Sequence, residues 1–323
     1  MFNANSKRRA DWMEISADYK CNNQCVGCFG VSDGGGSMTT RDILVALKQG
    51  RALGAENFWF GGGEPTLRSD MFKVITLAAK TGYKRIKLQT NGLMLAYPKF
   101  LKKAVASGLN EVNFSIKGAS PKLHDSLTNT PRCHELMVEA IKESKKLGLT
   151  LEGDILLYTT NVHELPEMIQ TYHALGVERF NLWHFSSVDA GAENLNHLVP
   201  TMTELMDSIK KAMDLGLSYR PDFITSFHTP ACVIPKDYRT CLFHAPDLNL
   251  IVANPGFEGN HYFWLEESPI EGGHYLESCT DCTHRTRCGG IRKEYMEVHG
   301  TKEFIPLSLP TGPSGGNSPS RYP

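Results

Sequence analysis

Two groups of cysteines are the residues of this chain whose types and spacing most strongly suggest chemistry. Of the nine cysteines, three lie within eight residues near the start and three within ten residues near the end. In a reducing compartment, thiols clustered in this way indicate metal binding or redox chemistry rather than disulfides. The two groups are Cys21, Cys25 and Cys28, and Cys279, Cys282 and Cys288.

The first group can hold three corners of a cubane iron–sulfur cluster. Such a cluster ordinarily takes four ligands, so three thiols leave one iron open to a substrate or cofactor. The alternative is a structural zinc loop, which needs four tetrahedral ligands and a second pair of cysteines from elsewhere. The second group could supply that pair. The turn at Gly62-Gly63-Glu64-Pro65, which ends the next predicted strand, would then have no explanation.

The elements that must position these thiols alternate between strand and helix patterns up to about residue 215. The strand patterns are rich in β-branched or aromatic residues. Between them lie helical patterns, with Thr39 or Thr40 and Ser69-Asp70 as candidate N-caps and Gly148 at one helix end. The predicted strands are Trp12–Tyr19, Asn57–Gly61, Arg85–Thr90, Glu111–Lys117, Leu149–Tyr158 and Arg179–Phe185.

Six βα units predict an α/β fold, namely a partial (β/α)6 TIM-like barrel. A closed barrel has eight units and usually about 250 residues, so we expect an incomplete barrel that is open at one side. The first cysteine group follows the first strand. It is therefore expected at the end of the barrel where barrel enzymes carry out chemistry.

The motifs at successive strand ends resemble the signature of the radical S-adenosylmethionine (SAM) superfamily. The first group has the family's C-x3-C-x2-C spacing, the second strand ends in a GGEP-like Gly61-Gly62-Gly63-Glu64-Pro65, and the third ends in Thr90-Asn91-Gly92. The resemblance covers residues 12 to about 215. It implies a [4Fe–4S] cluster with an open iron site on the first three cysteines, and SAM bound to that iron. It also implies reductive cleavage of SAM to a 5′-deoxyadenosyl radical.

The resemblance further implies which residues bind the cofactor. Glycines 61–63 would let the backbone approach the methionyl group, because they carry no side chain. The family typically has an aromatic residue where this chain has Gly27, so Phe29 is expected to contact the adenine instead. Ser115, Lys117 and Asp154 either face the ribose or carboxylate of SAM or are polar residues at the edge of the core. The full set expected to bind the cofactor is Phe29, Gly61, Gly62, Gly63, Glu64, Pro65, Asn91, Ser115, Lys117 and Asp154.

The second cysteine group resembles a reduced SPASM or twitch extension, which carries auxiliary clusters. Full SPASM has a further cysteine where this chain has Arg292, and another family cysteine falls at His261. The resemblance therefore implies one closed auxiliary [4Fe–4S] cluster. Zinc is the alternative metal, and Cys232 or His261 are alternatives to Cys241 as fourth ligand. The expected ligands are Cys241, Cys279, Cys282 and Cys288.

Two cysteines belong to neither group. Cys133 precedes a helical pattern and is expected to be an ordinary small apolar residue. Cys232 is either an inert thiol or a catalytic residue that donates a hydrogen atom to a substrate radical, as in some peptide epimerases of the family.

Composition divides the chain into three parts. Residues 12–215 are expected to form the radical SAM partial barrel, and residues 216–306 a small, loop-rich, cysteine-rich C-terminal extension of the SPASM/twitch type. In that extension, Leu248–Ala253 is predicted to be a strand that ends at a turn over residues 254–256. Residues 307–323 are rich in proline, glycine and serine, which predicts a disordered tail or, alternatively, a flap over the active site.

The overall composition excludes several classes of protein. The 323 residues are 41% hydrophobic and 21% charged, as is typical of globular chains. Because 34 basic residues balance 35 acidic ones, nucleic acid is not an expected partner. No secretion signal or stretch long enough to span a membrane is present in the sequence, so we expect a cytoplasmic protein without membrane partners.

These observations predict a radical SAM enzyme that modifies an unreactive C–H position of its substrate. Resemblance to the auxiliary-cluster subgroup favours a peptide or protein substrate, with crosslinking, epimerisation or oxidation as the reaction. One alternative is a radical SAM enzyme that acts on a small metabolite or nucleotide in cofactor or natural-product biosynthesis. Another is a non-catalytic metal-binding or electron-transfer protein. The resemblance also implies an external electron donor such as flavodoxin or ferredoxin.

Overall fold

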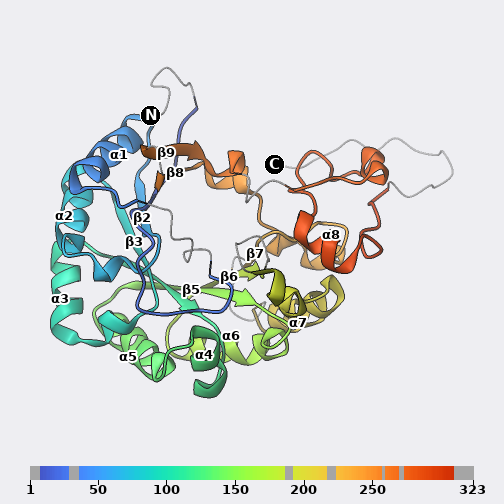
Figure 1. Cartoon of the computed structure of the whole chain (residues 1–323), viewed down its shortest axis with the longest axis horizontal. Coiled ribbons are helices and arrows are strands. Elements are labelled where there is room, and N and C mark those ends of the chain that lie inside the picture. Colours follow the sequence, from blue (N-terminus) through green and yellow to red (C-terminus); the bar gives the residue numbers. More distant parts are fainter. Residues whose placement is uncertain are drawn as a thin grey trace.

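A computed structural model of the chain describes residues 8–28, 36–185, 192–216, 223–256, 259–268 and 273–308. Phe29 and residues 309–323, which include most of the predicted tail, lie outside this part of the chain. Helices cover the outer side of one curved sheet, and the C-terminal segment lies beside one end of that sheet (Figure 1).

One nine-stranded sheet organises the described residues. Its strands are β1 (Trp12–Ser16), β2 (Asn57–Gly61), β3 (Arg85–Thr90), β4 (Glu111–Ile116), β5 (Thr150–Leu157), β6 (Arg179–His184), β7 (Ile224–Ser226), β8 (Leu250–Gly256) and β9 (Gly259–Trp264). Their order is β7-β6-β5-β4-β3-β2-β1-β8-β9, and every neighbouring pair is parallel except β8 with β9. Since β7 and β9 are the two edges, the barrel is partial, which confirms the predicted fold class.

The six predicted strands correspond to β1 to β6, and each predicted bound lies within three residues of the observed one. The sheet nevertheless continues beyond residue 215, because β7 extends it on one side and β8 pairs with β1 on the other. The predicted turn at residues 254–256 is wrong, since these residues belong to β8 and pair with β9. Pro255 is tolerated there because the pairing with β1 ends at Ala253, so the proline nitrogen is not needed for that ladder.

The helices follow the signals seen in the sequence. Thr39 caps α1 in a capping box with Asp42, and Asp70 is the N-cap of α2. No helix in the described part of the chain is both long and apolar enough to cross a bilayer. The helices are α1 (Thr40–Ala52), α2 (Met71–Thr81), α3 (Pro98–Ser107), α4 (Pro121–Thr128), α5 (Cys133–Lys146), α6 (Leu165–Ala174), α7 (Met202–Gly216) and α8 (Lys293–His299).

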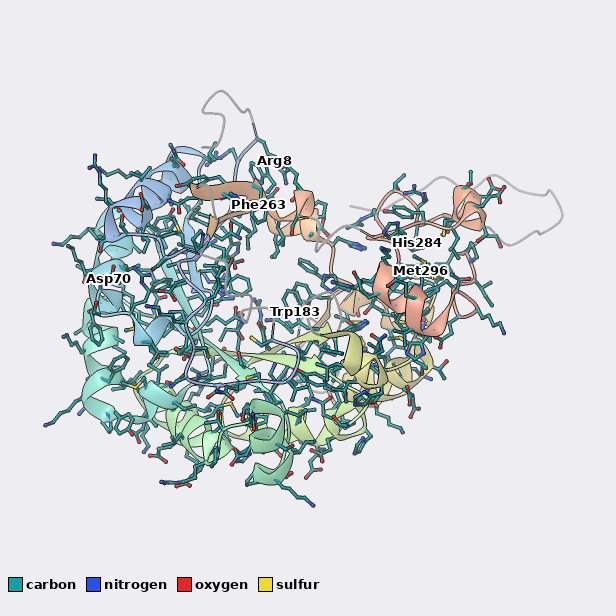
Figure 2. The ribbon with its side chains drawn as sticks, viewed as in Figure 1. Arg8, Asp70, Trp183, Phe263, His284 and Met296 are labelled. Atoms are coloured by element: carbon teal, nitrogen blue, oxygen red, sulfur yellow. The ribbon has the colours of Figure 1, made fainter. Side chains whose placement is uncertain are left out.

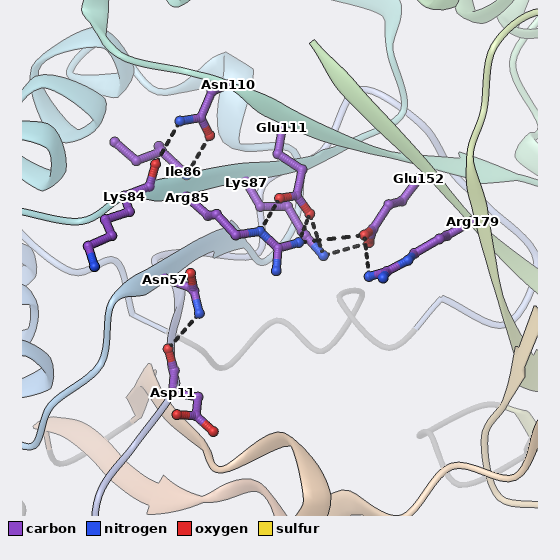
Figure 3. Close-up of polar contacts among 10 residues, drawn as sticks. All are labelled: Asp11, Asn57, Lys84, Arg85, Ile86, Lys87, Asn110, Glu111, Glu152 and Arg179. Atoms are coloured by element: carbon purple, nitrogen blue, oxygen red, sulfur yellow. Dashed lines mark hydrogen bonds and ion pairs between the residues drawn. The ribbon is translucent and has the colours of Figure 1, made fainter. Parts of the chain in front are cut away.

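The inner face of the sheet carries a buried network of charges at the amino ends of its strands (Figure 3). Lys87 Nζ lies 2.8 Å from a Glu111 oxygen and 2.5 Å from a Glu152 oxygen, with Arg85 2.8 Å from Glu111. Lys87 also lies over the ring of Trp12, at 4.7 Å from its centroid. Burial raises the pKa of Glu152, whereas Lys87 and Arg85 outweigh burial at Glu111 and hold its pKa below the ordinary value. Charge pairing therefore replaces an apolar core at this end of the barrel.

The C-terminal segment is joined to the barrel through the start of α7. The backbone N–H of Thr203 donates to Glu303 Oε1 at 2.8 Å, and that of Met202 donates to the Tyr295 hydroxyl at 2.7 Å. Tyr295 in turn donates to Glu303. A carboxylate at a helix N-terminus is favourable because the helix dipole is positive there. These contacts fix the cysteine-bearing segment to the sheet's β7 side.

Candidate functional site

The first cysteine group lies on the loop that follows β1, at the carboxyl end of the strand, as the sequence predicts. Cys21 is exposed, and Cys25 and Cys28 are half-buried. Burial raises the pKa of Cys21 to about 11, and the nearby thiols of Cys25 and Cys28 contribute to the rise, so the three thiols are neighbours. The N–H of Asn23 donates to Cys21 Sγ at 3.4 Å. Hydrogen bonds to cysteine sulfur are one means by which proteins tune iron–sulfur clusters.

Lys117 lies close to this loop. Burial raises the pKa of the Cys25 thiol, and the nearby Lys117 ammonium counteracts that rise. Lys117 follows the last residue of β4, so its charge reaches the loop from the end of a strand that lies three positions from β1 in the sheet. The structure thus brings this candidate residue to the thiols, where it favours a thiolate.

Main-chain contacts hold the cysteine loop in place. The N–H groups of Gln24 and Val26 donate to the carbonyls of Thr128 (3.2 Å) and Leu127 (2.9 Å) at the end of α4. Tyr158 is the residue after β5, and its hydroxyl donates to the Val26 carbonyl at 2.8 Å. The thiols are therefore positioned by elements more than 100 residues further along the chain.

The glycine motif packs directly against the chain that leads into this loop. Gly62 has φ +109°, and a Cβ there would lie 2.4 Å from the Asp18 carbonyl oxygen. A Cβ at Gly63 would lie 2.3 Å from the Lys20 carbonyl oxygen, to which the next N–H, that of Glu64, donates at 2.7 Å. Gly61 is different, because the atom nearest to an added Cβ is 3.7 Å away. Gly62 and Gly63 are thus required by the chain's own packing, whereas Gly61 leaves space beside the inner face of the sheet.

Glu64 links the ends of β2 and β3. Its carboxylate is buried and accepts from the hydroxyls of Thr66 (2.5 Å) and Thr90 (2.8 Å) and from the N–H of Asn91 (2.8 Å). Burial raises its pKa, and these hydrogen bonds oppose the rise. Pro65 is buried and begins a short 3-10 helix that ends at Leu67. Glu64 therefore holds the ends of β2 and β3 together through its hydrogen bonds, a role that the sequence motif did not reveal.

Asn91 connects the end of β3 to the cysteine loop. Its side-chain amide donates to Asn22 Oδ1 at 2.7 Å and lies 4.0 Å from Cys21 Sγ. Asn23, the neighbouring loop residue, donates from its amide to the thiol of buried Cys133 at 3.3 Å. Cys133 is therefore close to the site although it belongs to α5.

Gly27 stands where the related family typically has an aromatic residue, and a phenylalanine from another strand end fills the space beside it. A Cβ at Gly27, which has φ +63°, would lie 2.0 Å from Phe185 Cε2. Phe185 follows β6, and its ring centroid lies 5.0 Å from that of Tyr158. The prediction that Phe29 replaces the missing aromatic falls outside the described residues. Phe185 was not foreseen, because its contact with the loop spans most of the barrel.

Arg68 joins the two sides of the loop and was also missed from the sequence. Its guanidinium lies 2.8 Å from Asp18 Oδ2, before the loop, and 3.0 Å from the Met38 carbonyl, after it. It also donates to Asp70 Oδ1 at 2.9 Å. Asp18 and Met38 are 50 and 30 residues from Arg68 along the chain, so no local pattern points to this contact.

Asp154 lies on the inner face of β5, below the cysteine loop. It accepts from the side-chain amides of Gln89 (3.0 Å) and Asn181 (2.9 Å), and burial raises its pKa. Ser115 is its register partner on β4, so the two share the inner face. The structure thus gathers these candidates inside the barrel, on the same face as the space beside Gly61.

A buried histidine holds α4, which carries the two carbonyls that brace the loop. His124 Nδ1 accepts from the N–H of Lys117 at 3.3 Å. Burial, aided by the charges of His134 and Lys117, lowers the pKa of His124 to about 3, so it stays neutral while an unfolded histidine would be protonated below about pH 6.5.

This shift makes stability depend on pH. Because the folded pKa is depressed, the unfolded state takes up the proton first, and stability is lost as the pH falls below 6.5. We expect the free energy of unfolding to fall by about 2 kcal/mol between pH 7 and pH 5 because of this histidine. Asparagine keeps an acceptor near the Nδ1 position, so His124→Asn should lose about 2 kcal/mol less than the wild type between pH 7 and pH 5 in urea unfolding. Equal losses in both proteins would contradict this assignment.

The second cysteine group lines a pocket with Cys232, and not with Cys241. Cys232, Cys279, Cys282 and Cys288 all border this pocket. Cys241, the predicted fourth ligand, is 1% exposed within the hydrophobic core. His261 does not border the pocket either, since it pairs with Asn254 in the β8–β9 hairpin. Among the described residues, no three histidine, cysteine, aspartate or glutamate side chains are gathered tightly enough to form a complete metal site.

An aromatic stack extends from the end of β6 toward the C-terminal segment. The ring of Trp183 lies 4.0 Å from that of Phe227, which lies 3.9 Å from that of Phe243. Figure 2 shows Trp183 on the inner side of the curved sheet. This stack offers an aromatic surface on the face that also carries Asp154.

Known proteins similar to this chain include enzymes with different substrates. The chain is 26% identical over 209 residues to a probable GTP 3′,8-cyclase of Sulfurisphaera tokodaii, a match that covers 64% of each chain. It is 26% identical over 194 residues to the PqqA peptide cyclase of Bradyrhizobium diazoefficiens, covering 59% of this chain and 50% of that one. The chain thus spans less than two thirds of the length of either relative.

Its fold is similar to that of Streptococcus suis SuiB bound to the precursor peptide SuiA, with a TM-score of 0.55. That match covers 67% of this chain and 48% of the other at 15% identity, so it bears on the fold alone. Residues 18–172, which include the cysteine loop, the glycine motif and β2 to β5, match the family model of the radical SAM superfamily. The chain therefore contains a domain of the radical SAM superfamily.

Proposed function

We propose that this chain is an enzyme that uses SAM and a [4Fe–4S] cluster to modify an unreactive C–H position. The observation that carries the proposal is the group of three neighbouring thiols on a braced loop at the carboxyl end of β1, within the matched residues. The superfamily implies a [4Fe–4S] cluster and SAM as cofactors. Cys21, Cys25 and Cys28 supply three soft donors, which suits a cluster that keeps one iron open.

In this proposal the residues around the loop bind and orient SAM. Space beside Gly61 admits the ligand on the inner face, and the Asn91 amide and Lys117 ammonium reach the loop from the ends of β3 and β4. Ser115 and Asp154 offer polar contacts deeper in the barrel. Phe29, Gly62, Gly63, Glu64 and Pro65 complete the proposed set.

When bound, the cluster and SAM supply a carbon-centred radical that removes a hydrogen atom from the substrate. The chain's own part is to hold the thiols still and to keep water from the reacting centre. The thiols are held in place by contacts of the loop backbone with Tyr158, Phe185 and the end of α4. The aromatic stack from Trp183 to Phe243 contributes to keeping water from the reacting centre. The electron comes from an external donor such as flavodoxin or ferredoxin.

For the substrate we propose a peptide or protein. Among the described residues the sheet ends at β7 on one side and at β9 on the other and does not close on itself, so the barrel is open at one side and can admit an extended chain. The aromatic stack on the inner face suits an aromatic or apolar side chain. The PqqA peptide cyclase among the relatives acts on a peptide. A nucleotide such as GTP is the second candidate, since relatives named GTP 3′,8-cyclase match a similar share of the chain.

The direct test is SAM cleavage by the wild-type chain. Anaerobically reconstituted and reduced protein should release 5′-deoxyadenosine from SAM, and omission of the reductant should prevent this. Release that increases with candidate peptides but not with GTP would support the peptide proposal, and the reverse would favour the nucleotide. Protein that binds about four irons at this site but leaves SAM intact under all these conditions would overturn the proposed function.

A further inference from the structure

The pocket lined by four cysteines brings together residues from two separate segments. Cys279, Cys282 and Cys288 lie on one loop, whereas Cys232 comes from the segment after β7, 47 positions before Cys279. Burial raises the pKa of the Cys232 thiol to about 11, and the thiols of Cys288, Cys282 and Cys279 contribute to the rise. The four thiols are therefore neighbours in space, and the pocket between them is bordered by apolar residues such as Ile291 and Phe304.

The loop backbone presents the three later thiols from tight turns. The N–H of Cys282 donates to the Cys279 carbonyl at 3.1 Å, and that of Cys288 donates to the His284 carbonyl at 2.9 Å. The N–H of Gly290 donates to Cys288 Sγ at 3.4 Å. Gly290 has φ +81° and packs against Gly273, where a Cβ would lie 2.8 Å from the Gly273 carbonyl carbon. The turns and the N–H directed at sulfur are features of cysteines that serve as metal ligands.

Cys241 is kept away from this pocket by the pairing that follows it. Its neighbour Leu242 forms a bridge with Ser226 at the end of β7, and the N–H of Phe243 donates to the Ser226 carbonyl at 3.1 Å. This pairing directs Cys241 into the core, where burial raises its pKa to about 12 without a contribution from another cysteine. A thiol in apolar surroundings is inert rather than a ligand.

We infer that Cys232, Cys279, Cys282 and Cys288 form a four-thiolate site for a soft metal centre, either an iron–sulfur cluster or zinc. The thiols border one pocket but are not drawn to a common point, so metal binding must pull them together and displace their protons. Cys232 is then a ligand and not a hydrogen-atom donor to a substrate. The inference does not depend on SAM chemistry at the first cysteine group.

The test uses the full chain with Cys21, Cys25 and Cys28 replaced by alanine, so that any bound metal reports on the second site alone. This protein should bind about four irons with sulfide on anaerobic reconstitution, or about one zinc when zinc alone is supplied. In that background Cys232→Ala should weaken zinc binding at least tenfold, because only three of the four thiolate ligands of zinc remain, whereas the matched control Cys241→Ala should bind zinc as before. Whichever metal binds more tightly identifies the centre.

Thiol alkylation gives a second readout that does not rely on folding of the Cys232 variant. In the same background, bound metal should protect Cys232 together with the three loop cysteines from iodoacetamide, as measured by mass spectrometry of peptides. The alkylation of Cys241 should not change with metal. The inference is overturned if the chain binds neither metal, or if metal protects Cys241 and leaves Cys232 reactive.

Discussion

Cys25→Ala is expected to abolish release of 5′-deoxyadenosine from SAM. It leaves two thiols on the loop after β1, one fewer than the three on which the proposed cluster depends. Loss of an outer partner of a metal ligand typically costs 10- to 100-fold, so loss of the ligand itself should exceed about 100-fold. The measurement is 5′-deoxyadenosine per chain under reducing conditions, with iron content determined on the same samples.

Cys133→Ala is the matched control. This thiol is buried and accepts a hydrogen bond from Asn23, so it lies beside the loop without belonging to the proposed ligand set. Its loss removes one weak N–H···S contact, and activity should stay within about tenfold of the wild type. If Cys133→Ala were inactive while Cys25→Ala turned over normally, the proposed ligand set would have to be abandoned.

Lys87→Met is expected to be the most destabilising single change inside the barrel. Methionine keeps most of the side-chain volume against Trp12, but it leaves the buried carboxylates of Glu111 and Glu152 without the ammonium between them. The side chains of Lys87, Glu111 and Glu152 are 7%, 2% and 4% exposed, so water cannot take over its role. Breaking a buried ion pair from one side costs about 3–5 kcal/mol. This should lower the melting temperature by about 10 °C.

The control for Lys87 lies just before the same strand. Lys84 pairs with Glu56 at 2.7 Å, but both side chains are at least half exposed. Lys84→Met should therefore change stability by less than about 1 kcal/mol. Combining Lys87→Met with Glu152→Gln should restore part of the lost stability, since it removes one of the two buried carboxylates that no longer face an ammonium. Equal melting temperatures for Lys87→Met and Lys84→Met would show that the buried network contributes no net stability.

The amino-acid sequence by itself determined the local elements and the position of the first cysteine group. Runs rich in β-branched or aromatic residues placed β2 and β3 at their observed bounds, because such a composition is a local property of a few residues. The position of the cysteine loop followed in the same way, since a loop directly after the first strand of a parallel sheet must lie at its carboxyl edge. The motif at Glu64 could be located, but not its hydrogen bonds to Thr66, Thr90 and Asn91.

Only the tertiary structure decided which distant residues meet. It placed Phe185 beside Gly27, brought β8 to the open side of β1, and put Cys232 rather than Cys241 with the second cysteine group. Cys232 and Cys241 are nine positions apart, and nothing in their spacing to Cys279 separates one from the other as a ligand. The difference arises because the pairing of Leu242 with Ser226 turns one thiol into the core. Contacts of this kind depend on how whole helices and strands pack together, so a short stretch of sequence does not predict them.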